Sequence, residues 1–196
     1  MSSILVAYAT GEGQTAAVAD RVGTVVGGRG HDVDVVDLGG DAAPGVVSYD
    51  AVIVGSSVHY GRHGKRVRRF VRDNRAALAA RPTAFFQLSL ASAEGSDDAV
   101  AEAAGYVEAF LEAVDWHPDR VAQFGGALRY SKYGFLRRLV MRRMVGDSFP
   151  EADPAGDTEF TDWDEVEAFA NDVAAFVEGR LGAAPDAGAD ATDPAS

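Results

Sequence analysis

The sequence predicts an α/β fold in which a five-stranded parallel sheet is doubly wound, with helices on both of its faces. Five short, β-rich runs alternate with segments whose apolar residues recur at helical spacing, which is the pattern of strands joined by helical crossovers. The runs SILVAYA and AVIVG are almost continuously apolar, as strands buried on both faces are. A chain of 196 residues is long enough for one domain with a substantial core.

Each predicted strand is a short run rich in β-branched or aromatic residues. In chain order the strands are Ser3–Ala9, Asp32–Leu38, Asp50–Gly55, Thr83–Leu90 and Val121–Leu128. The carboxyl ends of parallel strands meet at one edge of the sheet, where ligands of such folds bind. Three connections should therefore lie together at that edge: Thr10–Thr15, Ser56–Gly61 and Ser89–Gly95.

Helices are predicted between the strands by apolar stripes. They cover Gln14–Gly27, Val67–Leu78, Asp97–Val114 and Thr161–Leu181. In the third we expect an inward face of Val100, Ala104, Val107 and Leu111. In the last, Thr161 and Asp164 resemble a capping box, and Trp163 is expected in the core along with Val166, Phe169, Ala170, Val173, Phe176 and Val177.

Composition excludes several classes of site. The chain has no cysteine and four scattered histidines, so disulfides, iron–sulfur clusters and thiolate zinc sites are excluded and no metal site is expected. No apolar run reaches membrane-span length, and the start lacks the features of a signal peptide. We therefore expect a cytoplasmic location. The net charge of −12 with only two lysines suggests adaptation to high salt, where self-repulsion is screened.

The positive charge is concentrated in two short segments. Seven bases lie between Arg62 and Arg75, and six between Arg129 and Arg143. This distribution indicates an anionic ligand or an anionic membrane surface, and solvated helix faces are the alternative. Nucleic acid is not expected as a partner because the chain as a whole is strongly acidic.

The stretch YATGEGQTAA indicates an anion site. It joins the first strand to a helix whose free N–H groups and dipole favour an anion. Gly11 and Gly13 let the backbone close around the ligand, and two threonines add hydroxyls. No lysine follows, so the turn is not the nucleoside-triphosphate loop. A phosphate monoester fits best.

A dinucleotide-binding fold is the competing interpretation of this turn. Gly11, Gly13 and Ala16 satisfy G-x-G-x-x-A, and Asp37 ends the second strand where a ribose-binding acid would lie. The flanking hydroxyls suit a terminal phosphate better than a bridging pyrophosphate. In the phosphate interpretation Asp37 is a surface or helix-capping acid.

TGEGQT (10–15) resembles the phosphate loop of flavodoxin-like proteins. Three further segments together resemble the menaquinone-dependent protoporphyrinogen IX dehydrogenase family. They are GSSVHYGRH (55–63), WHPDRVAQFGGALRY (116–130) and TDWDEVEAFA (161–170). The resemblance implies a flavodoxin-like fold with strand order 2-1-3-4-5, FMN as cofactor and electron transfer to a membrane quinone. It also implies an inserted segment after the fifth strand, in agreement with the long connection 129–159.

The resemblance implies which residues contact the cofactor. The FMN phosphate is expected on Thr10, Gly11, Glu12, Gly13, Gln14 and Thr15, with Glu12 giving only its backbone N–H. The flavin ring is expected to border Ser56, Ser57, Val58, His59, Tyr60 and Gly61, and its pyrimidine edge to meet Ser89, Leu90, Ala91 and Ser92. Tyr60 can stack on the ring, with a plain surface tyrosine as the alternative. For His59 the alternative is a loop residue, and Trp116 is expected to pack in the protein.

The inserted segment is the clearest partner signal. As a helix, SKYGFLRRLVMRRMV would align Tyr133, Leu136, Val140 and Met144, with Arg138 and Arg142 roughly opposite. Such a face suits an anionic membrane or a macrocycle with two propionates, and a helix packed on the domain is the alternative. The candidate substrate or membrane contacts are Arg129, Tyr130, Lys132, Tyr133, Arg137, Arg138 and Arg142.

We therefore expect an FMN-dependent oxidoreductase of haem biosynthesis. It would oxidise protoporphyrinogen IX to protoporphyrin IX and pass electrons to menaquinone, as a peripheral protein on the inner face of the cell membrane. No side chain is expected to be catalytic, because the cofactor carries the chemistry. The alternatives are an electron carrier or general quinone reductase with no porphyrin role, and a binding module without flavin.

The domain organisation follows from the same patterns. Residues 1–181 are expected to form one domain that includes the insert 129–159, and residues 182–196 an acidic, disordered tail. The Pro- and Gly-rich stretch 146–158 would be a lid or a linker. The oligomeric state stays open.

Overall fold

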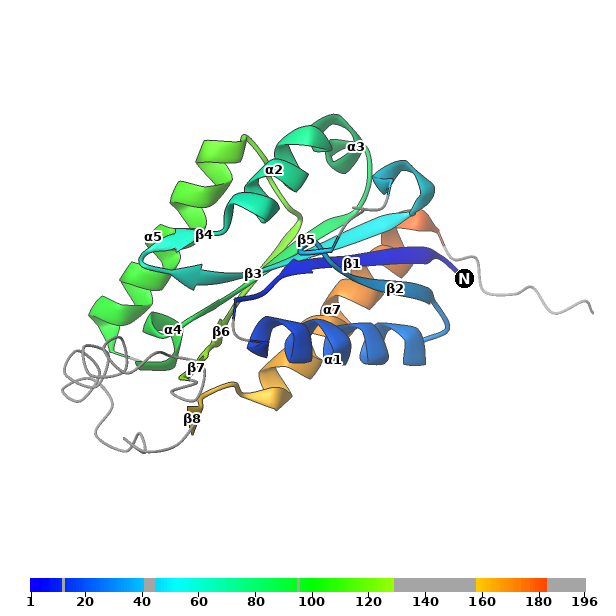
Figure 1. Ribbon diagram of the computed structural model, residues 1–196. Helices are drawn as coiled ribbons and strands as arrows, with labels where there is room; N and C mark the ends of the chain where they lie inside the picture. Colours follow the sequence, from blue (N-terminus) through cyan, green and yellow to red (C-terminus); the bar gives the residue numbers. More distant parts are fainter. Residues whose placement is uncertain (12, 41–44, 95, 129–157, 183–196) are drawn as a thin grey trace, which may run out of the picture.

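The computed structural model describes residues 1–11, 13–40, 45–94, 96–128 and 158–182. A parallel sheet is sandwiched between two layers of helices (Figure 1). Its strands are β1 (Ser3–Ala9), β2 (Asp32–Asp37), β3 (Ala51–His59), β5 (Thr83–Ser89) and β6 (Arg120–Gly125). They lie in the order β2-β1-β3-β5-β6, which confirms the predicted order 2-1-3-4-5.

Helices cover both faces of the sheet, so the doubly wound architecture is confirmed as well. In Figure 1, α1 (Gln14–Gly28) and α7 (Trp163–Leu181) lie below the sheet. The other face carries α2 (Lys65–Asp73), α3 (Arg75–Ala79) and α5 (Asp97–Val114). The described residues also form two short helices, η1 (Val46–Ser48) and α4 (Ala91–Glu94).

Alternation along the strands explains their continuous apolar character. Ile4 and Val6 of β1 belong to the core under α1 and α7, whereas Leu5 and Ala7 belong to the core under α2 and α5. Successive side chains of a strand point to opposite faces. Both faces of this sheet are covered, so most positions of the central strands are apolar, and a buried polar exception, Gln87 of β5, is hydrogen-bonded.

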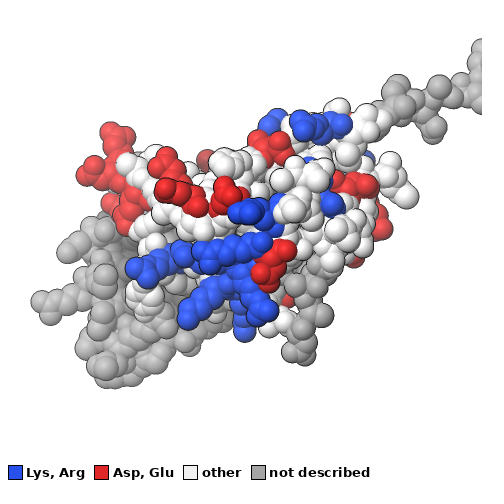
Figure 2. Space-filling view, turned by 90° about the horizontal axis from the view of Figure 1, so that it is seen from above, with Lys and Arg blue, Asp and Glu red and all other residues white. Residues whose placement is uncertain are grey.

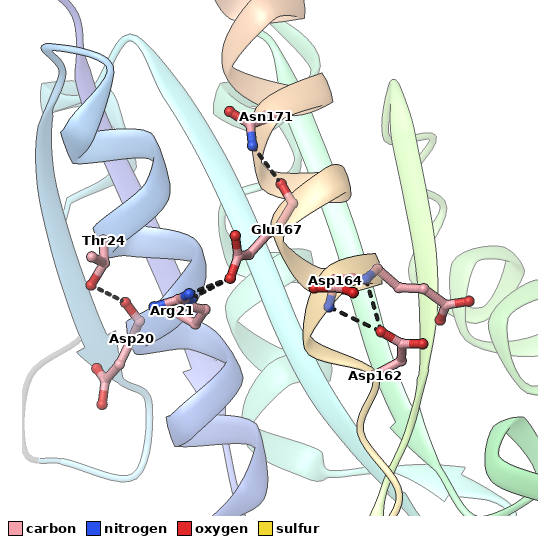
Figure 3. Close-up of polar contacts among 8 residues, drawn as sticks. Asp20, Arg21, Thr24, Asp162, Asp164, Glu167 and Asn171 are labelled. Carbon is pink, nitrogen blue, oxygen red and sulfur yellow. Dashed lines mark hydrogen bonds and ion pairs between the residues drawn. The ribbon is translucent and has the colours of Figure 1, made fainter.

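The helices α1 and α7 lie side by side although they are far apart in the sequence. Their exposed edges are joined by Arg21–Glu167 and by Arg29–Glu178, the latter over 2.7 Å. Figure 3 shows the first of these contacts and the start of α7, where the Asp162 carboxylate accepts from the N–H groups of Asp164 and Glu165. The predicted cap at Thr161 is therefore wrong. The carboxylate at the next position takes the cap, and the Thr161 hydroxyl bonds elsewhere.

Two predicted element boundaries are wrong on the α2 side. Strand β3 runs on to His59 and turns back as β4 (Arg62–His63), which pairs antiparallel with it. The predicted helix 67–78 is divided into α2 and α3, because Asn74 between them has a non-helical backbone and its side chain bonds the Phe70 carbonyl.

The fifth strand is shorter than predicted. β6 ends at Gly125, and β7 (Ala127–Leu128) pairs antiparallel with β8 (Thr158–Glu159) in a separate small sheet. A Cβ at Gly125 would lie 2.3 Å from the Phe160 carbonyl oxygen. The chain therefore leaves the main sheet at the glycine pair, where only a bare backbone allows this approach.

The inward face of α5 also differs from the prediction. Its buried residues are Ala99, Ala103, Val107, Phe110 and Val114, and Val100 is 55% exposed. Phe110 stacks on Phe85 with ring centroids 5.0 Å apart, and burial of this large ring sets the rotation of the helix. In α7, Trp163 is only partly buried, and its indole N–H donates to Glu159 over 2.8 Å.

Candidate functional site

The three predicted ligand segments meet at the carboxyl edge of the sheet. Ala9 of β1 is in register with Ser56 of β3, and Ser57 with Leu88 of β5. Ser89 is in register with Gly125 of β6. The turn after β1, the end of β3 and the turn after β5 therefore lie in adjacent positions along one edge, as predicted.

The turn after β1 has the features that favour an anion. Gly13 caps α1 with a φ of 98°, a left-handed conformation that suits glycine, and no side chain caps the helix. The Thr10 hydroxyl accepts from the Gly13 N–H over 2.8 Å and shapes the turn. No acidic residue lies in the first turn of α1. The positive end of the helix therefore faces the turn without a carboxylate from that first turn to neutralise it.

The first two residues of α1 are both buried. The Gln14 amide donates to the Thr161 hydroxyl over 2.9 Å, and that hydroxyl donates to the Gly125 carbonyl over 2.8 Å. The side chain of Gln14 is thus directed to the end of β6. Thr161 is a site residue that the sequence analysis treated only as a helix cap.

His59 lies against the same turn. A Cβ at Gly11 would lie 2.7 Å from His59 Nε2, so the glycine makes room for the imidazole. The same nitrogen lies 3.1 Å from the Ser57 hydroxyl. The ring therefore lies between the end of β3 and the phosphate-type turn.

Tyr60 and Gly61 form a two-residue hairpin between β3 and β4. Both have positive φ, 52° and 71°, as a type I′ turn requires. A tyrosine in this conformation is uncommon, and such strained residues concentrate at ligand sites. The Tyr60 side chain is 81% exposed. The hairpin thus presents an aromatic ring at the edge of the site.

The turn after β5 carries two serines that bond each other. Their hydroxyl oxygens lie 2.7 Å apart, and the Ser92 N–H donates to the Ser89 hydroxyl over 3.0 Å. The Gly126 N–H donates to the Ser89 carbonyl over 2.9 Å. With both hydroxyls engaged, recognition here falls to the backbone of Leu90 and Ala91, which stays a prediction.

His63 is a buried titratable residue behind the hairpin, and the sequence analysis did not select it. Its ring lies 4.6 Å from that of Phe110 and 5.5 Å from that of Phe85, centroid to centroid. Burial, reinforced by the charge of Arg68, lowers the pKa of His63 to about 4. It is therefore a neutral imidazole that anchors β4. The sequence could have pointed to His63 only through its position, three residues after Tyr60.

Other predicted residues have clear positions. Trp116 is buried and meets Phe85 edge-on with ring centroids 5.9 Å apart, which agrees with packing. Asp37 accepts from the Gly39 N–H over 2.7 Å and shapes the turn after β2. Glu12, the stretch 146–157 and the insert contacts Arg129, Tyr130, Lys132, Tyr133, Arg137, Arg138 and Arg142 lie outside the described residues.

The described ranges lack a membrane-spanning helix and a cluster of metal ligands. No helix in them is both long and apolar enough to cross a membrane. In the same ranges, no group of three or more His, Asp or Glu side chains is placed to hold a metal ion. What the edge offers is a helix start open to an anion, an exposed aromatic ring and backbone groups between them, an arrangement that fits a cofactor combining a phosphate with a planar ring.

Comparison with known proteins agrees with this geometry. A flavodoxin domain model matches residues 5–149. Protoporphyrinogen IX dehydrogenase (quinone) of Escherichia coli K12 is 29% identical over 87% of this chain and 93% of its own. The enzyme of that name from Leishmania major is 30% identical over 88% of this chain and 74% of its own. Oxidised flavodoxin 2 from Bacillus cereus shares the fold, with a TM-score of 0.53, 20% identity and coverage of 90% of this chain and 99% of its own.

Proposed function

The chain belongs to the flavodoxin domain family and, with its protoporphyrinogen IX dehydrogenase (quinone) relatives, to one enzyme family, and we propose that it oxidises protoporphyrinogen IX. It is an oxidoreductase that uses FMN. We propose menaquinone as the electron acceptor and haem biosynthesis as the pathway.

The residues present fit FMN. The observation that carries the proposal is the start of α1, where Gly13 is left-handed, no side chain caps the helix and no acid lies in the first turn. A phosphate there receives backbone N–H groups and the positive end of the helix dipole. The Thr10 hydroxyl, whose oxygen already accepts from Gly13, has its proton left to donate to the phosphate.

The ring portion of the cofactor has a matching frame. We propose that Tyr60, exposed on its hairpin, stacks on the ring, and that the backbone of Leu90 and Ala91 meets the pyrimidine edge. Bound FMN supplies the ability to take electrons from one partner and pass them to another. The protein holds the ring in place and shields one face of it from water.

We propose that substrate and acceptor are handled by different parts of the chain. The insert arginines, from Arg129 to Arg142, are expected to pair with the substrate's propionates, because guanidinium binds carboxylate strongly. Menaquinone is dissolved in lipid, so we propose a peripheral location on the inner face of the cell membrane.

Porphyrin fluorescence tests the proposal. FMN-loaded protein is mixed anaerobically with protoporphyrinogen IX in high salt, with and without a menaquinone analogue. Quinone-dependent growth of fluorescence is expected, with protein stripped of FMN as the blank and restored activity after FMN is added back.

The alternatives give different results in the same assay. No fluorescence from protein whose flavin is bound and reducible would make the chain an electron carrier or a general quinone reductase. Failure to bind FMN at all would favour a binding module that has kept only the fold.

A further inference from the structure

Four basic side chains form a patch on the α2 face of the molecule. Arg62 lies on β4, and Lys65, Arg66 and Arg69 lie on the first two turns of α2. All four are exposed. Figure 2 looks onto this face and shows Lys and Arg gathered near its middle, with Asp and Glu mainly above them and to their right. We call these four residues the basic patch.

The basic patch differs from its basic neighbours, two of which have structural partners. Arg72 donates to the Ala113 carbonyl over 2.8 Å, and Arg75 pairs with Asp115 over 2.7 Å. Both contacts fasten the α2–α3 segment to the end of α5. Arg68 is half-buried beside His63 and contributes to the lowered pKa of that histidine. Arg72 and Arg75 are therefore accounted for by the fold.

The cations of the basic patch are free or weakly held. Among the described residues, no carboxylate oxygen lies within 4 Å of the charged groups of Arg62, Lys65 or Arg66. Arg69 pairs with Asp73 over 3.3 Å, but their side chains are 85% and 61% exposed. An ion pair that exposed is worth little.

The placement of these charges is locally unfavourable for the fold. Lys65 and Arg66 stand in the first turn of α2, where the helix dipole disfavours cations and where no acid is present. Lys65 and Arg69 are four positions apart, and like charges at this spacing repel each other. A chain with thirty acidic residues and a net charge of −12 has nevertheless collected cations here. When charges are placed unfavourably for the helix and no nearby group offsets them, a functional reason for their position is indicated.

The basic patch is continuous with the cofactor edge. Arg62 follows the Tyr60–Gly61 hairpin directly, and Gly64 caps the helix that begins at Lys65. A partner that covers the basic patch is therefore brought next to the hairpin that borders the proposed flavin ring. An electron acceptor dissolved in such a partner would have a short path to the ring.

We propose that the basic patch is a docking surface for the anionic phosphates of lipid headgroups, which orients the cofactor edge toward the quinone in the membrane. This inference rests on the proposed function. A membrane fits better than a nucleic acid because the neighbouring acidic residues and the negative total charge would repel a long polyanion. Arginine makes bidentate contacts to phosphate, and such direct contacts persist at salt concentrations that screen longer-range attraction.

The test is vesicle flotation of the FMN-loaded protein. Vesicles of phosphatidylglycerol mixed with phosphatidylcholine are compared with pure phosphatidylcholine. The patch variant is Arg62→Gln, Lys65→Gln and Arg66→Gln. The matched control is Arg21→Gln, Arg29→Gln and Arg180→Gln, which removes the same charge from the α1–α7 face. FMN content and unfolding midpoint verify that each variant is folded.

The wild type and the control are expected to float with anionic vesicles only. At about 1 kcal/mol per cation near the surface, the patch variant should bind about a hundredfold more weakly. Equal flotation of the patch variant and the wild type would overturn the proposal. Failure of the wild type to float with anionic vesicles would also overturn it. Capture by an acidic protein without vesicle binding would assign the basic patch to a protein partner instead.

The proposed function fails independently of this inference. Porphyrinogen oxidation by the wild type with a water-soluble quinone needs no membrane, and vesicle flotation needs no substrate. Flotation without oxidation would support the docking surface and contradict the proposed substrate. Oxidation without flotation would support the proposed substrate and contradict the docking surface.

Discussion

The amide of Gln14 donates to the hydroxyl of Thr161 over 2.9 Å, although the two residues are 147 positions apart in the chain. Gln14 is the first residue of α1, and Thr161 lies just before α7. The hydroxyl also holds the Gly125 carbonyl, where β6 ends. One side chain thus fixes the anion-binding helix start relative to the point where the chain leaves the sheet toward β7.

Replacing Thr161 with valine should loosen the anion site. Thr161→Val keeps the shape of the side chain but removes both hydrogen bonds. Because these groups are partly buried, we expect a loss of about 1–3 kcal/mol in the free energy of unfolding. FMN affinity should fall about tenfold, because the start of α1 is no longer tied to the end of β6. Urea denaturation and flavin-quenching titration measure the two effects.

The control for this variant is Thr24→Val. The Thr24 hydroxyl donates to the Asp20 carbonyl within α1 and is exposed, so its loss should cost under about 0.5 kcal/mol. If Thr161→Val matched this control in both measurements, the link from Gln14 to Gly125 would have no role in positioning the site.

Tyr60 should show opposite effects on stability and cofactor binding. A residue other than glycine in the left-handed region carries about 1–2 kcal/mol of strain. Tyr60→Gly is therefore expected to stabilise the protein without FMN by about 1 kcal/mol and to weaken FMN binding through loss of stacking. Tyr60→Phe should preserve both properties. A glycine variant that bound FMN as tightly as the wild type would show that Tyr60 is a plain surface tyrosine.

Gly11 and His59 should be energetically coupled. In Gly11→Ala the new methyl carbon would lie 2.7 Å from His59 Nε2, so the imidazole must move away. We expect this single variant to weaken FMN binding, and the double variant Gly11→Ala, His59→Ala to lose less than the sum of the two single changes. Binding constants of the four proteins give the coupling directly, and strict additivity would argue against the contact.

His63 should make the fold sensitive to mild acid. Its pKa is about 4 in the folded protein against an ordinary 6.5, so between these values the unfolded chain binds a proton that the folded chain does not. Stability is therefore full above pH 6.5 and is lost as the pH falls toward 4, by roughly 3 kcal/mol in total. Urea unfolding between pH 7.5 and pH 4.5 measures the slope.

The variant His63→Phe removes this titration and should flatten the slope. The phenylalanine ring matches the aromatic surroundings of Phe85 and Phe110. His117→Gln, at an exposed position, should keep the wild-type slope. An unchanged slope in His63→Phe would mean that other groups cause the acid sensitivity.

The anion-binding turn could be found from the sequence because its signals are local. The glycines before a helix start and the flanking threonines are visible in TGEGQT, although the same stretch carries Glu12. The role of Thr161 could not be found in this way. A threonine before a helix predicts a cap, and here the adjacent Asp162 takes the cap while Thr161 bonds a residue 147 positions away.

The hairpin at Tyr60 was missed for a different reason. Ser56–Gly61 was expected to be a loop, but β3 continues through its first four residues. Two-residue hairpins usually have Asn-Gly or Asp-Gly at the turn, which makes them recognisable in a sequence. Here a tyrosine takes the strained first position of the turn, so only the glycine at the second position indicates a hairpin.

The sequence by itself determined the alternation of strands and helices, their order along the chain and the anion-binding start of α1, since periodicity and glycine placement act on the backbone within a few residues. The tertiary structure decided where the strands end, which face α5 buries and which arginines are free. Arg72 and Arg75 reach the end of α5, whereas Arg62 and Lys65 meet no described carboxylate. Whether an arginine finds a partner depends on residues that are far apart in the chain, and no local sequence pattern contains those distances.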